Sequence, residues 1–205
     1  EEDVKKYSMD IKSSAHALLG IINDILDFSK IESGRMEIVP AEYELNSMLN
    51  DLYNMFLLRA QEKGLMFDVS VDASLPSKLY GDDLRIRQVL SNLLTNAVKY
   101  TRKGTVTFEV AGERDGADVI LHFAVRDTGI GIRQEDIPKL FSAFERLDEE
   151  KNRDIEGTGL GMNISLQLLK LMDTDLRVES VYGEGTRFFF DLRQKVVNEE
   201  AIGNF

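Results

Sequence analysis

The chain has 205 residues, of which 43% are hydrophobic and 30% are charged, a composition that supports a folded domain with a buried core. Acidic residues outnumber basic ones by 36 to 25, and the formal net charge of −11 disfavours binding to nucleic acid or to an anionic membrane surface. The absence of cysteine excludes disulfides and thiolate metal ligands, and the two histidines lack the short spacings of zinc sites. Because the sequence begins with Glu1 rather than Met, we expect a piece of a longer protein.

The first 33 residues predict one long amphipathic helix, which Gly34 ends. Apolar residues recur there at spacings of three and four: Val4, Tyr7, Ile11, Ala15, Leu18, Ile22 and Ile25. Further apolar residues widen this stripe, which favours packing against partner helices, and packing on the rest of the domain is the alternative.

The remaining sequence alternates helical and extended patterns. In chain order we expect helices over about residues 44–63, 83–100 and 162–172, and strands over about 67–71, 106–110, 119–125, 176–181 and 186–192. Asp82 is placed to cap the second of these helices, and Asp115 and Gly116 suit the turn of a hairpin. The expected fold is α+β, a two-layer sandwich of helices on a mixed, mostly antiparallel sheet.

Residues 133–156 form a long polar segment with weak periodicity. Only a short helical piece is expected, near Phe141 to Phe144. A segment of this length in a small domain is typical of a functional lid or of a disordered region.

Two glycine-rich turns suggest a nucleotide site. Residues 127–131 (DTGIG) follow a predicted strand, and residues 157–161 (GTGLG) precede a predicted helix. Glycines let the backbone approach a phosphate closely, and a helix N-terminus favours an anion. Met162 stands where G-x-G-x-x-G needs its third glycine, and there is no Gly-Lys pair for a Walker A loop, so both common nucleotide folds are disfavoured.

A polar strip is predicted on the helix of residues 83–100. Gln88, Asn92, Asn96 and Lys99 recur at intervals of four, four and three, so they share one helix face. Amide oxygens are suitable Mg²⁺ ligands, and Lys99 could meet a phosphate as a point charge. A solvated helix face is the alternative, although two asparagines four apart are poor helix formers.

The sequence resembles the ATP-binding half of a sensor histidine kinase of the hybrid type, within the GHKL superfamily. Its motifs occur in family order: an N box at 92–101, a first glycine box at 127–131, an F box at 141–146, a second glycine box at 157–162 and a third at 183–186.

The resemblance implies that ATP and Mg²⁺ bind and that phosphoryl transfer follows. Asp127 would accept a hydrogen bond from the adenine amine, and would reject GTP, whose carbonyl at that position is also an acceptor. Asn96, assisted by Asn92, would coordinate Mg²⁺, and Lys99 and Tyr100 would lie near the phosphates and ribose.

Further roles fall on the glycine boxes and on the lid. The nucleotide would also meet residues of all three glycine boxes: Gly129, Gly131, Gly157, Thr158, Gly159, Leu160, Gly161 and Thr186. Arg146 would act in catalysis with Asn92, Asn96 and Lys99 by neutralising charge on the γ-phosphate, and Arg153 is a second lid candidate. Phe141 and Phe144 would anchor the lid.

Two other functions stay open. ATP hydrolases of the superfamily place a water-activating Glu four residues before the metal-binding Asn, where this sequence has Asn92, so phosphoryl transfer is favoured over hydrolysis. A degenerate module that binds nucleotide without transfer is the other alternative.

The phosphoacceptor histidine of the family does not match this sequence. In the family, Glu or Asp follows that histidine at once and Pro follows a few residues later, whereas His16 precedes Ala17 and the first proline is Pro40. His122 suits a structural role in a strand. Autophosphorylation by this chain alone is therefore expected to be absent or negligible.

The resemblance also implies the domain organisation and the partners. Residues 1–34 would be the second helix of the dimerisation hairpin, residues 35–195 the catalytic ATP-binding domain, and residues 196–205 an acidic linker. The expected partners are the phosphoacceptor helix of the parent kinase, a downstream response regulator or receiver domain, and a second copy in a homodimer, with the domain in the cytoplasm.

Overall fold

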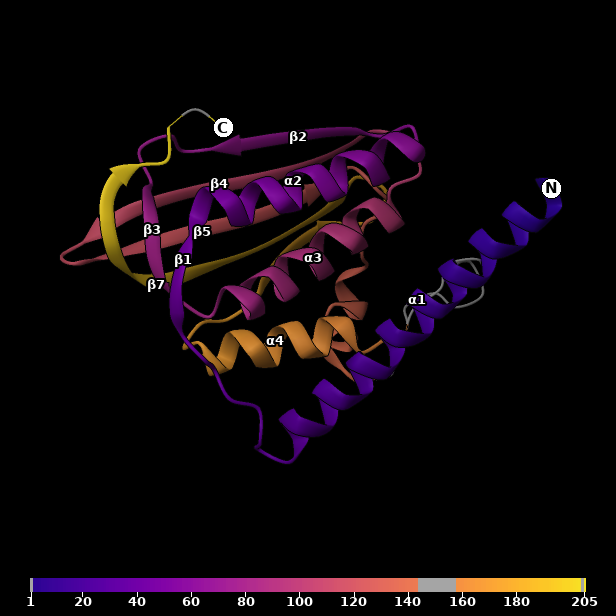
Figure 1. Cartoon of the computed structure of the whole chain (residues 1–205), viewed down its shortest axis with the longest axis horizontal. Coiled ribbons are helices and arrows are strands. Elements are labelled where there is room, and N and C mark those ends of the chain that lie inside the picture. The colour runs from indigo at the N-terminus through magenta and orange to yellow at the C-terminus, as the bar shows by residue number, and fades with distance from the viewer. Residues whose placement is uncertain (1, 144–157, 204) are drawn as a thin grey trace.

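A seven-stranded sheet with helices on one face forms the body of the domain (Figure 1). The computed structural model describes residues 2–143, 158–203 and 205. The helices are α1 (Glu2–Glu32), α2 (Leu45–Glu62), α3 (Asp83–Tyr100) and α4 (Gly161–Leu171), with short 3₁₀ turns η1 (Gln134–Asp136) and η2 (Pro138–Phe141). The strands are β1 (Ala41–Glu44), β2 (Met66–Val71), β3 (Pro76–Gly81), β4 (Thr105–Asp115), β5 (Asp118–Asp127), β6 (Arg177–Val181) and β7 (Gly185–Ala201).

The sheet is mixed but mostly antiparallel, which confirms the predicted fold class. Its order is β1-β3-β7-β5-β4-β2, and β6 pairs with β7 beside this path. Among the described strands, β2 and β4 pair in parallel, and the other pairs are antiparallel. The long central strands β4, β5 and β7 therefore form a rigid platform on which α2 and α3 lie (Figure 1).

The core lies between this sheet and the helices. On β5 the buried residues Val119, Leu121, Phe123 and Val125 alternate with less buried ones, as a strand with one covered face requires. On α3 the apolar residues Ile86, Leu90, Leu93, Leu94 and Ala97 are almost fully buried. The polar strip of α3 is thereby held at one edge of a tightly packed interface.

The capping of α3 agrees with the sequence prediction. The buried Asp82 side chain accepts a hydrogen bond from the backbone N–H of Arg85 at 3.1 Å. Its other oxygen accepts from the N–H of Val39 at 2.8 Å, in the segment between α1 and β1. One carboxylate therefore fixes both the start of α3 and the path by which the chain enters the domain.

The second histidine lies on the face of the sheet opposite the helices. His122 pairs with Asp191 across β5 and β7, and its Nδ1 lies 2.6 Å from the Asp191 Oδ1. This contact fits the structural role that the sequence suggested.

Three sequence expectations differ from the structure. The strands β1 and β3 were not predicted, because their short segments carry little apolar alternation. The expected linker over residues 196–205 is wrong for its first part: β7 continues to Ala201 and pairs with β3, and Ile202 packs against the core. The helical piece expected near Phe141 is replaced by η1 and η2, and Phe144 lies outside the described residues.

The helix α1 extends along one side of the domain (Figure 1), with the bounds that its sequence periodicity predicts. Much of its apolar stripe faces solvent, including Ile11 at 70% exposure and Leu18 at 57%. Within the described ranges, no helix combines the length and the apolarity that a bilayer crossing needs.

Candidate functional site

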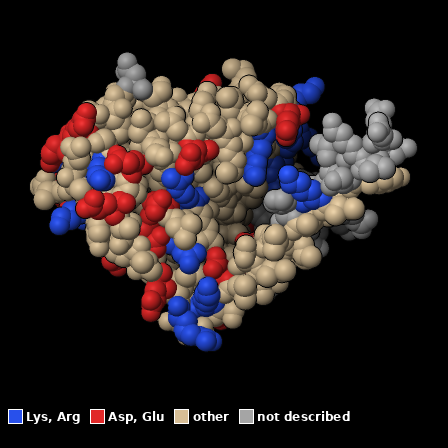
Figure 2. Space-filling view, viewed as in Figure 1, with Lys and Arg blue, Asp and Glu red and all other residues tan. Residues whose placement is uncertain are grey.

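A cavity of about 430 Å³ lies where α3, α4 and the ends of β5 and β7 meet, and α1 and the segment from β5 to η2 form further parts of its wall. Figure 2 shows it as a hollow between the body of the domain and α1. The cavity brings together ten of the residues predicted to bind nucleotide: Asn92, Asn96, Lys99, Tyr100, Asp127, Gly131, Thr158, Gly159, Gly161 and Thr186. Segments that are far apart in the sequence thus form one site.

Asp127 is the buried carboxylate of this site. It is the last residue of β5, beside Thr186 of β7, and only 6% of it is exposed. Burial raises the pKa of Asp127 to about 6, although backbone N–H groups of Gly129 and Thr186 oppose this by donating to the carboxylate. The donor–acceptor distance from the N–H of Gly129 is 2.8 Å. An acceptor fixed in this way is suited to recognise a specific donor on a ligand.

The turn after Asp127 can be built only with glycine at Gly131. This residue has a φ of 65°, and a methyl group on its α-carbon would overlap the carbonyl oxygen of Val181. The N–H of Gly183 also donates to the carbonyl of Ile130 at 2.8 Å. The first and third glycine boxes are therefore packed backbone to backbone beside the cavity.

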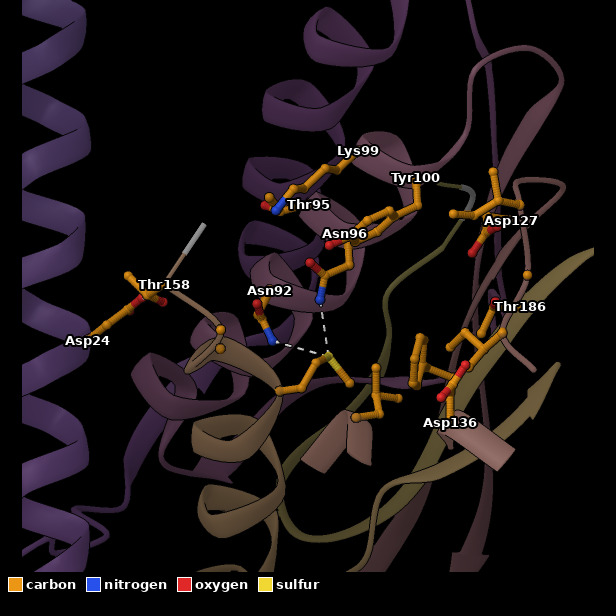
Figure 3. A pocket seen from close by; sticks show the side chains of 18 of the residues that line it. Asp24, Asn92, Thr95, Asn96, Lys99, Tyr100, Asp127, Asp136, Thr158 and Thr186 are labelled. Atoms are coloured by element: carbon orange, nitrogen blue, oxygen red, sulfur yellow. Dashed lines mark hydrogen bonds between the residues drawn. The ribbon is translucent and has the colours of Figure 1, made fainter. Parts of the chain in front are cut away.

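The polar strip of α3 faces the cavity at Asn92, Asn96 and Lys99 (Figure 3). The Asn92 amide nitrogen donates to the Ser165 hydroxyl at 2.9 Å. The amide nitrogens of Asn92 and Asn96 lie 3.6 and 3.0 Å from the Met162 sulfur. With the nitrogens directed to α4, the amide oxygens are the atoms suited to a cation such as Mg²⁺, which prefers oxygen ligands and keeps waters and phosphate oxygens.

Gln88, the first member of the predicted strip, lies elsewhere. Its amide nitrogen donates to the Asp27 carboxylate of α1 at 2.8 Å, and it is not part of the cavity wall. The helical spacing correctly placed it on the same side of α3, but one turn of the helix separates it from Asn92. It contacts α1 instead of the cavity.

The second glycine box leads into the N-terminus of α4 at Gly161. The Thr158 hydroxyl accepts from the N–H of Leu160 at 3.2 Å and donates to the Asp24 carboxylate of α1 at 2.9 Å. A methyl group on Gly161 would overlap the end of the Asn92 side chain, so glycine here leaves the Asn92 amide in the position that the structure shows.

Two predicted site residues do not line the cavity, and two others cannot be placed. Leu160 is 1% exposed and belongs to the core, and Gly129 supports Asp127 through its N–H without lining the cavity. Arg146 and Gly157 lie outside the described residues, as does the other lid candidate, Arg153.

The structure adds wall residues that the sequence analysis did not identify. Asp127 lies at one end of the cavity (Figure 3), and apolar side chains of Ile130, Ile132, Leu140 and Phe188 form a slot in the cavity wall that suits a flat aromatic group. Ile130 and Ile132 alternate with the glycines of the first glycine box, and this pattern could have identified them as wall residues from the sequence. Ala17, Gly20, Ile21 and Asp24 of α1 also line the cavity, with Asp24 at the opposite end (Figure 3), and only the folded chain brings them there.

The Asp24 carboxylate is half-buried at this second end. Burial raises its pKa above the ordinary value, the hydrogen bond from Thr158 lowers it, and the charge of Asp27 raises it further. Asp24 lies across the cavity from Asp127, and Asp136 is a further carboxylate in the cavity wall (Figure 3).

Comparison with known proteins identifies the family. Residues 81–196 match the family described as histidine kinase-, DNA gyrase B-, and HSP90-like ATPase. The chain is 39% identical over 189 residues to the hybrid signal transduction histidine kinase B of Dictyostelium discoideum, covering 92% of this chain and 10% of that protein. It is 38% identical over 202 residues to the aerobic respiration control sensor protein ArcB of Escherichia coli K12, covering 98% of this chain and 26% of that protein. The chain thus spans between a tenth and about a quarter of the length of these relatives.

Solved structures agree with this assignment. Full-length ShkA, crystallised in complex with AMPPNP, superposes with a TM-score of 0.78 at 29% identity, covering 95% of this chain and 39% of that one. The histidine kinase AdeS of Acinetobacter baumannii, at 20% identity, shares the fold with a TM-score of 0.66 over 91% of this chain and 82% of that one. The resemblance drawn from the ordered motifs is confirmed: the chain belongs to the family of histidine kinase-, DNA gyrase B- and HSP90-like ATPases, with hybrid sensor histidine kinases among its relatives.

Proposed function

We propose that this chain is the ATP-binding catalytic domain of a two-component sensor histidine kinase, which transfers the γ-phosphoryl group of ATP to a histidine outside these residues. The observation that carries the proposal is the convergence of a buried carboxylate, an amide strip and a glycine-rich helix N-terminus on one cavity. The bound AMPPNP of the related ShkA structure supports a nucleotide as the ligand.

Asp127 would select adenine. Its carboxylate is held by backbone N–H groups beside an apolar slot, so an adenine ring could stack in the slot while its amine donates to Asp127. Guanine presents a carbonyl oxygen at the same position, and two facing acceptors in a buried site are unfavourable. The site would therefore bind ATP in preference to GTP.

Asn96 and Asn92 would hold Mg²⁺ through their amide oxygens, together with the phosphates and waters. When bound, Mg²⁺ would neutralise charge on the phosphates. Lys99, from the next turn of the same helix face, would add a positive charge near the phosphates, and Tyr100 would lie near the ribose.

The second glycine box would receive the phosphates. Thr158, Gly159 and Gly161 line the cavity directly before α4, whose N-terminal N–H groups and dipole favour an anion. Gly157 and Arg146 are proposed to complete the site on the grounds of the family resemblance.

Phosphoryl transfer is favoured over hydrolysis because of Asn92. Hydrolases of this fold need a general base at that position, whereas the Asn92 amide cannot take a proton and donates to Ser165. A module that binds nucleotide without transfer is the second candidate, and the presence of Asn92, Asn96 and Asp127 in the cavity wall argues against it.

The parent protein would supply the partners. Residues 1–34 would be the second helix of the dimerisation hairpin and would pair with the phosphoacceptor helix and with a second copy of the chain. The catalytic domain would then extend from residue 35 to 201 rather than to 195, since β7 reaches Ala201. A response regulator or receiver domain would accept the phosphoryl group next, in the cytoplasm.

A transfer assay tests this function. The chain is incubated with Mg²⁺, γ-labelled ATP and the isolated dimerisation hairpin of a related hybrid kinase, and label on the hairpin histidine is measured beside free phosphate. We expect labelled hairpin that is lost with Asn96→Ala, and no label on the chain alone. Release of free phosphate without labelled hairpin, abolished by Asn92→Ala, would instead support a hydrolase.

A further inference from the structure

The helix α1 forms part of the wall of the candidate nucleotide site. Ala17, Gly20, Ile21 and Asp24 line the cavity, and Asp24 lies at the end opposite Asp127 (Figure 3). These four residues lie on one face of α1, because spacings of three and four residues bring side chains to the same side of a helix. The position of α1 therefore determines the shape of that end of the cavity.

Two polar contacts fix α1 in this position. The Thr158 hydroxyl donates to the Asp24 carboxylate at 2.9 Å, directly before α4. One helical turn later, the Asp27 Oδ2 accepts from the Gln88 amide at 2.8 Å and lies 3.4 Å from the Arg85 guanidinium of α3. The side chains of Asp27 and Arg85 are only 16% and 17% exposed, so this second contact is well shielded.

The carboxylates of Asp24 and Asp27 differ in the charge of the group that each one contacts. Asp27 faces the positively charged Arg85, whereas Asp24 meets the neutral hydroxyl of Thr158. Among the residues that the structure describes, no Lys or Arg forms an ion pair with Asp24. Asp24 therefore presents to the cavity a half-buried carboxylate whose described hydrogen-bond partner is a neutral hydroxyl.

The cavity places this charge at the phosphate end of a bound nucleotide. Asp127 lies at one end, Asn92 and Asn96 lie between, and Thr158 with Asp24 lies at the other end (Figure 3). A nucleotide whose adenine contacts Asp127 would extend its phosphates past the asparagines toward Thr158. The last phosphate of a triphosphate would reach closest to Asp24.

We propose that Asp24 is a specificity-determining residue, which makes the site with α1 docked discriminate against nucleoside triphosphates in favour of diphosphates. This inference rests on the proposed nucleotide function. A third phosphate adds negative charge beside the Asp24 carboxylate, where partial burial weakens solvent screening. It would also compete with Asp24 for the Thr158 hydroxyl, since both are acceptors.

Thermodynamic linkage gives a second consequence. If docked α1 weakens the binding of a triphosphate, then a bound triphosphate weakens the docking of α1 by the same factor. ATP would release α1 from the catalytic domain more effectively than ADP does. The number of phosphates on the nucleotide would thereby control the contact between α1 and α4.

Calorimetric titration tests the discrimination. AMPPNP and ADP are titrated, in excess Mg²⁺, into the wild-type chain and into Asp24→Asn, whose amide oxygen can still accept from Thr158. We expect Asp24→Asn to raise the affinity for AMPPNP relative to ADP by about fivefold or more. Glu109→Gln is the matched control, because it removes one charge from an exposed position on β4 and should leave this ratio unchanged.

The position of α1 is measured separately. The chain has no cysteine, so Ser14→Cys on α1 and Lys170→Cys on α4 can carry a pair of fluorophores at two exposed positions. We expect saturating AMPPNP to reduce energy transfer more than saturating ADP does, and Asp24→Asn to diminish this difference.

The outcomes separate the two proposals. An AMPPNP-to-ADP ratio that is unchanged or lower in Asp24→Asn overturns the role of Asp24 while the nucleotide function stands. Equal energy transfer with both nucleotides overturns the linkage to α1. If the folded wild-type chain binds neither nucleotide, the proposed function itself fails, and the discrimination fails with it.

Discussion

Asp127 is the proposed adenine-binding residue, and burial of its charged carboxylate lowers the free energy of unfolding. Its carboxylate is almost completely buried, and burial raises its pKa to about 6. Between about pH 4 and pH 6 the folded chain keeps a proton that the unfolded chain has released, so the free energy of unfolding falls as the pH rises through this range. The charged form that would bind adenine is thus the form that destabilises the fold.

Replacement of this carboxylate should therefore stabilise the protein at neutral pH. We expect Asp127→Asn to raise the free energy of unfolding by about 2 kcal/mol at pH 7 and by much less at pH 4. Urea denaturation at the two pH values measures the difference. Asp72→Asn is the control, because hydrogen bonds from Ser74 lower the pKa of Asp72, and this variant should not become more stable at pH 7. Equal stability of Asp127→Asn and wild type at pH 7 would contradict the burial argument.

The site residues that could be predicted from the sequence lie inside contiguous motifs. Asp127, Asn92 and Asn96 were identifiable because their neighbours specify a strand end or a helix face. Asp24 was not, because it looks like any acidic residue of an amphipathic helix until the fold brings it to Thr158. A contact across 134 residues leaves no local signal.

At the scale of elements, close backbone packing defines the turns around the cavity. Gly131 and Gly116 have nearly the same φ, 65° and 64°, but their surroundings differ. A methyl group on Gly131 would overlap the Val181 backbone, whereas one on Gly116 would meet no atom within 4 Å.

Substitution of Gly116 and of Gly131 separates the cost of a left-handed backbone conformation from the cost of steric overlap. We expect Gly116→Ala to lower the free energy of unfolding by about 1 kcal/mol, the cost of a left-handed conformation. Gly131→Ala should cost about 3 kcal/mol in total, because the methyl group must also displace the Val181 backbone. Denaturant unfolding of both variants measures this, and equal losses would show that the turn accommodates the added methyl group.

The helices and long strands were predictable because their periodicity extends over several turns or pairs. The short strands β1 and β3 were not, since most of their residues lack apolar alternation and their pairing depends on distant partners. The extension of β7 to Ala201 was missed for a similar reason: its last residues are acidic and exposed, and pairing with β3 keeps them in the sheet.

At the scale of the whole molecule, α1 has two different faces. One contacts α3 and α4 through Asp24 and Asp27, and the other exposes an apolar stripe. Ile11, Leu18 and Ile25 recur at intervals of seven and are 70%, 57% and 49% exposed. A stripe with this period is typical of a helix that packs against other helices.

We expect the chain to self-associate through this stripe. Sedimentation velocity over a range of concentrations should show a reversible dimer in the wild type and a monomer in Leu18→Gln/Ile25→Gln. The matched control Met55→Gln/Leu58→Gln removes two exposed apolar side chains from α2 and should still dimerise. Identical behaviour of both double variants would place the interface elsewhere.

Binding of ATP through Asp127 can be measured by calorimetric titration. ATP and GTP are titrated with and without Mg²⁺ into the wild-type chain and into Asp127→Ala, with circular dichroism to show that both are folded. We expect the wild type to bind ATP but not GTP and to bind ATP more tightly with Mg²⁺, and we expect Asp127→Ala to lose this binding. Equal affinity for ATP and GTP, or undiminished ATP binding by folded Asp127→Ala, would contradict this expectation.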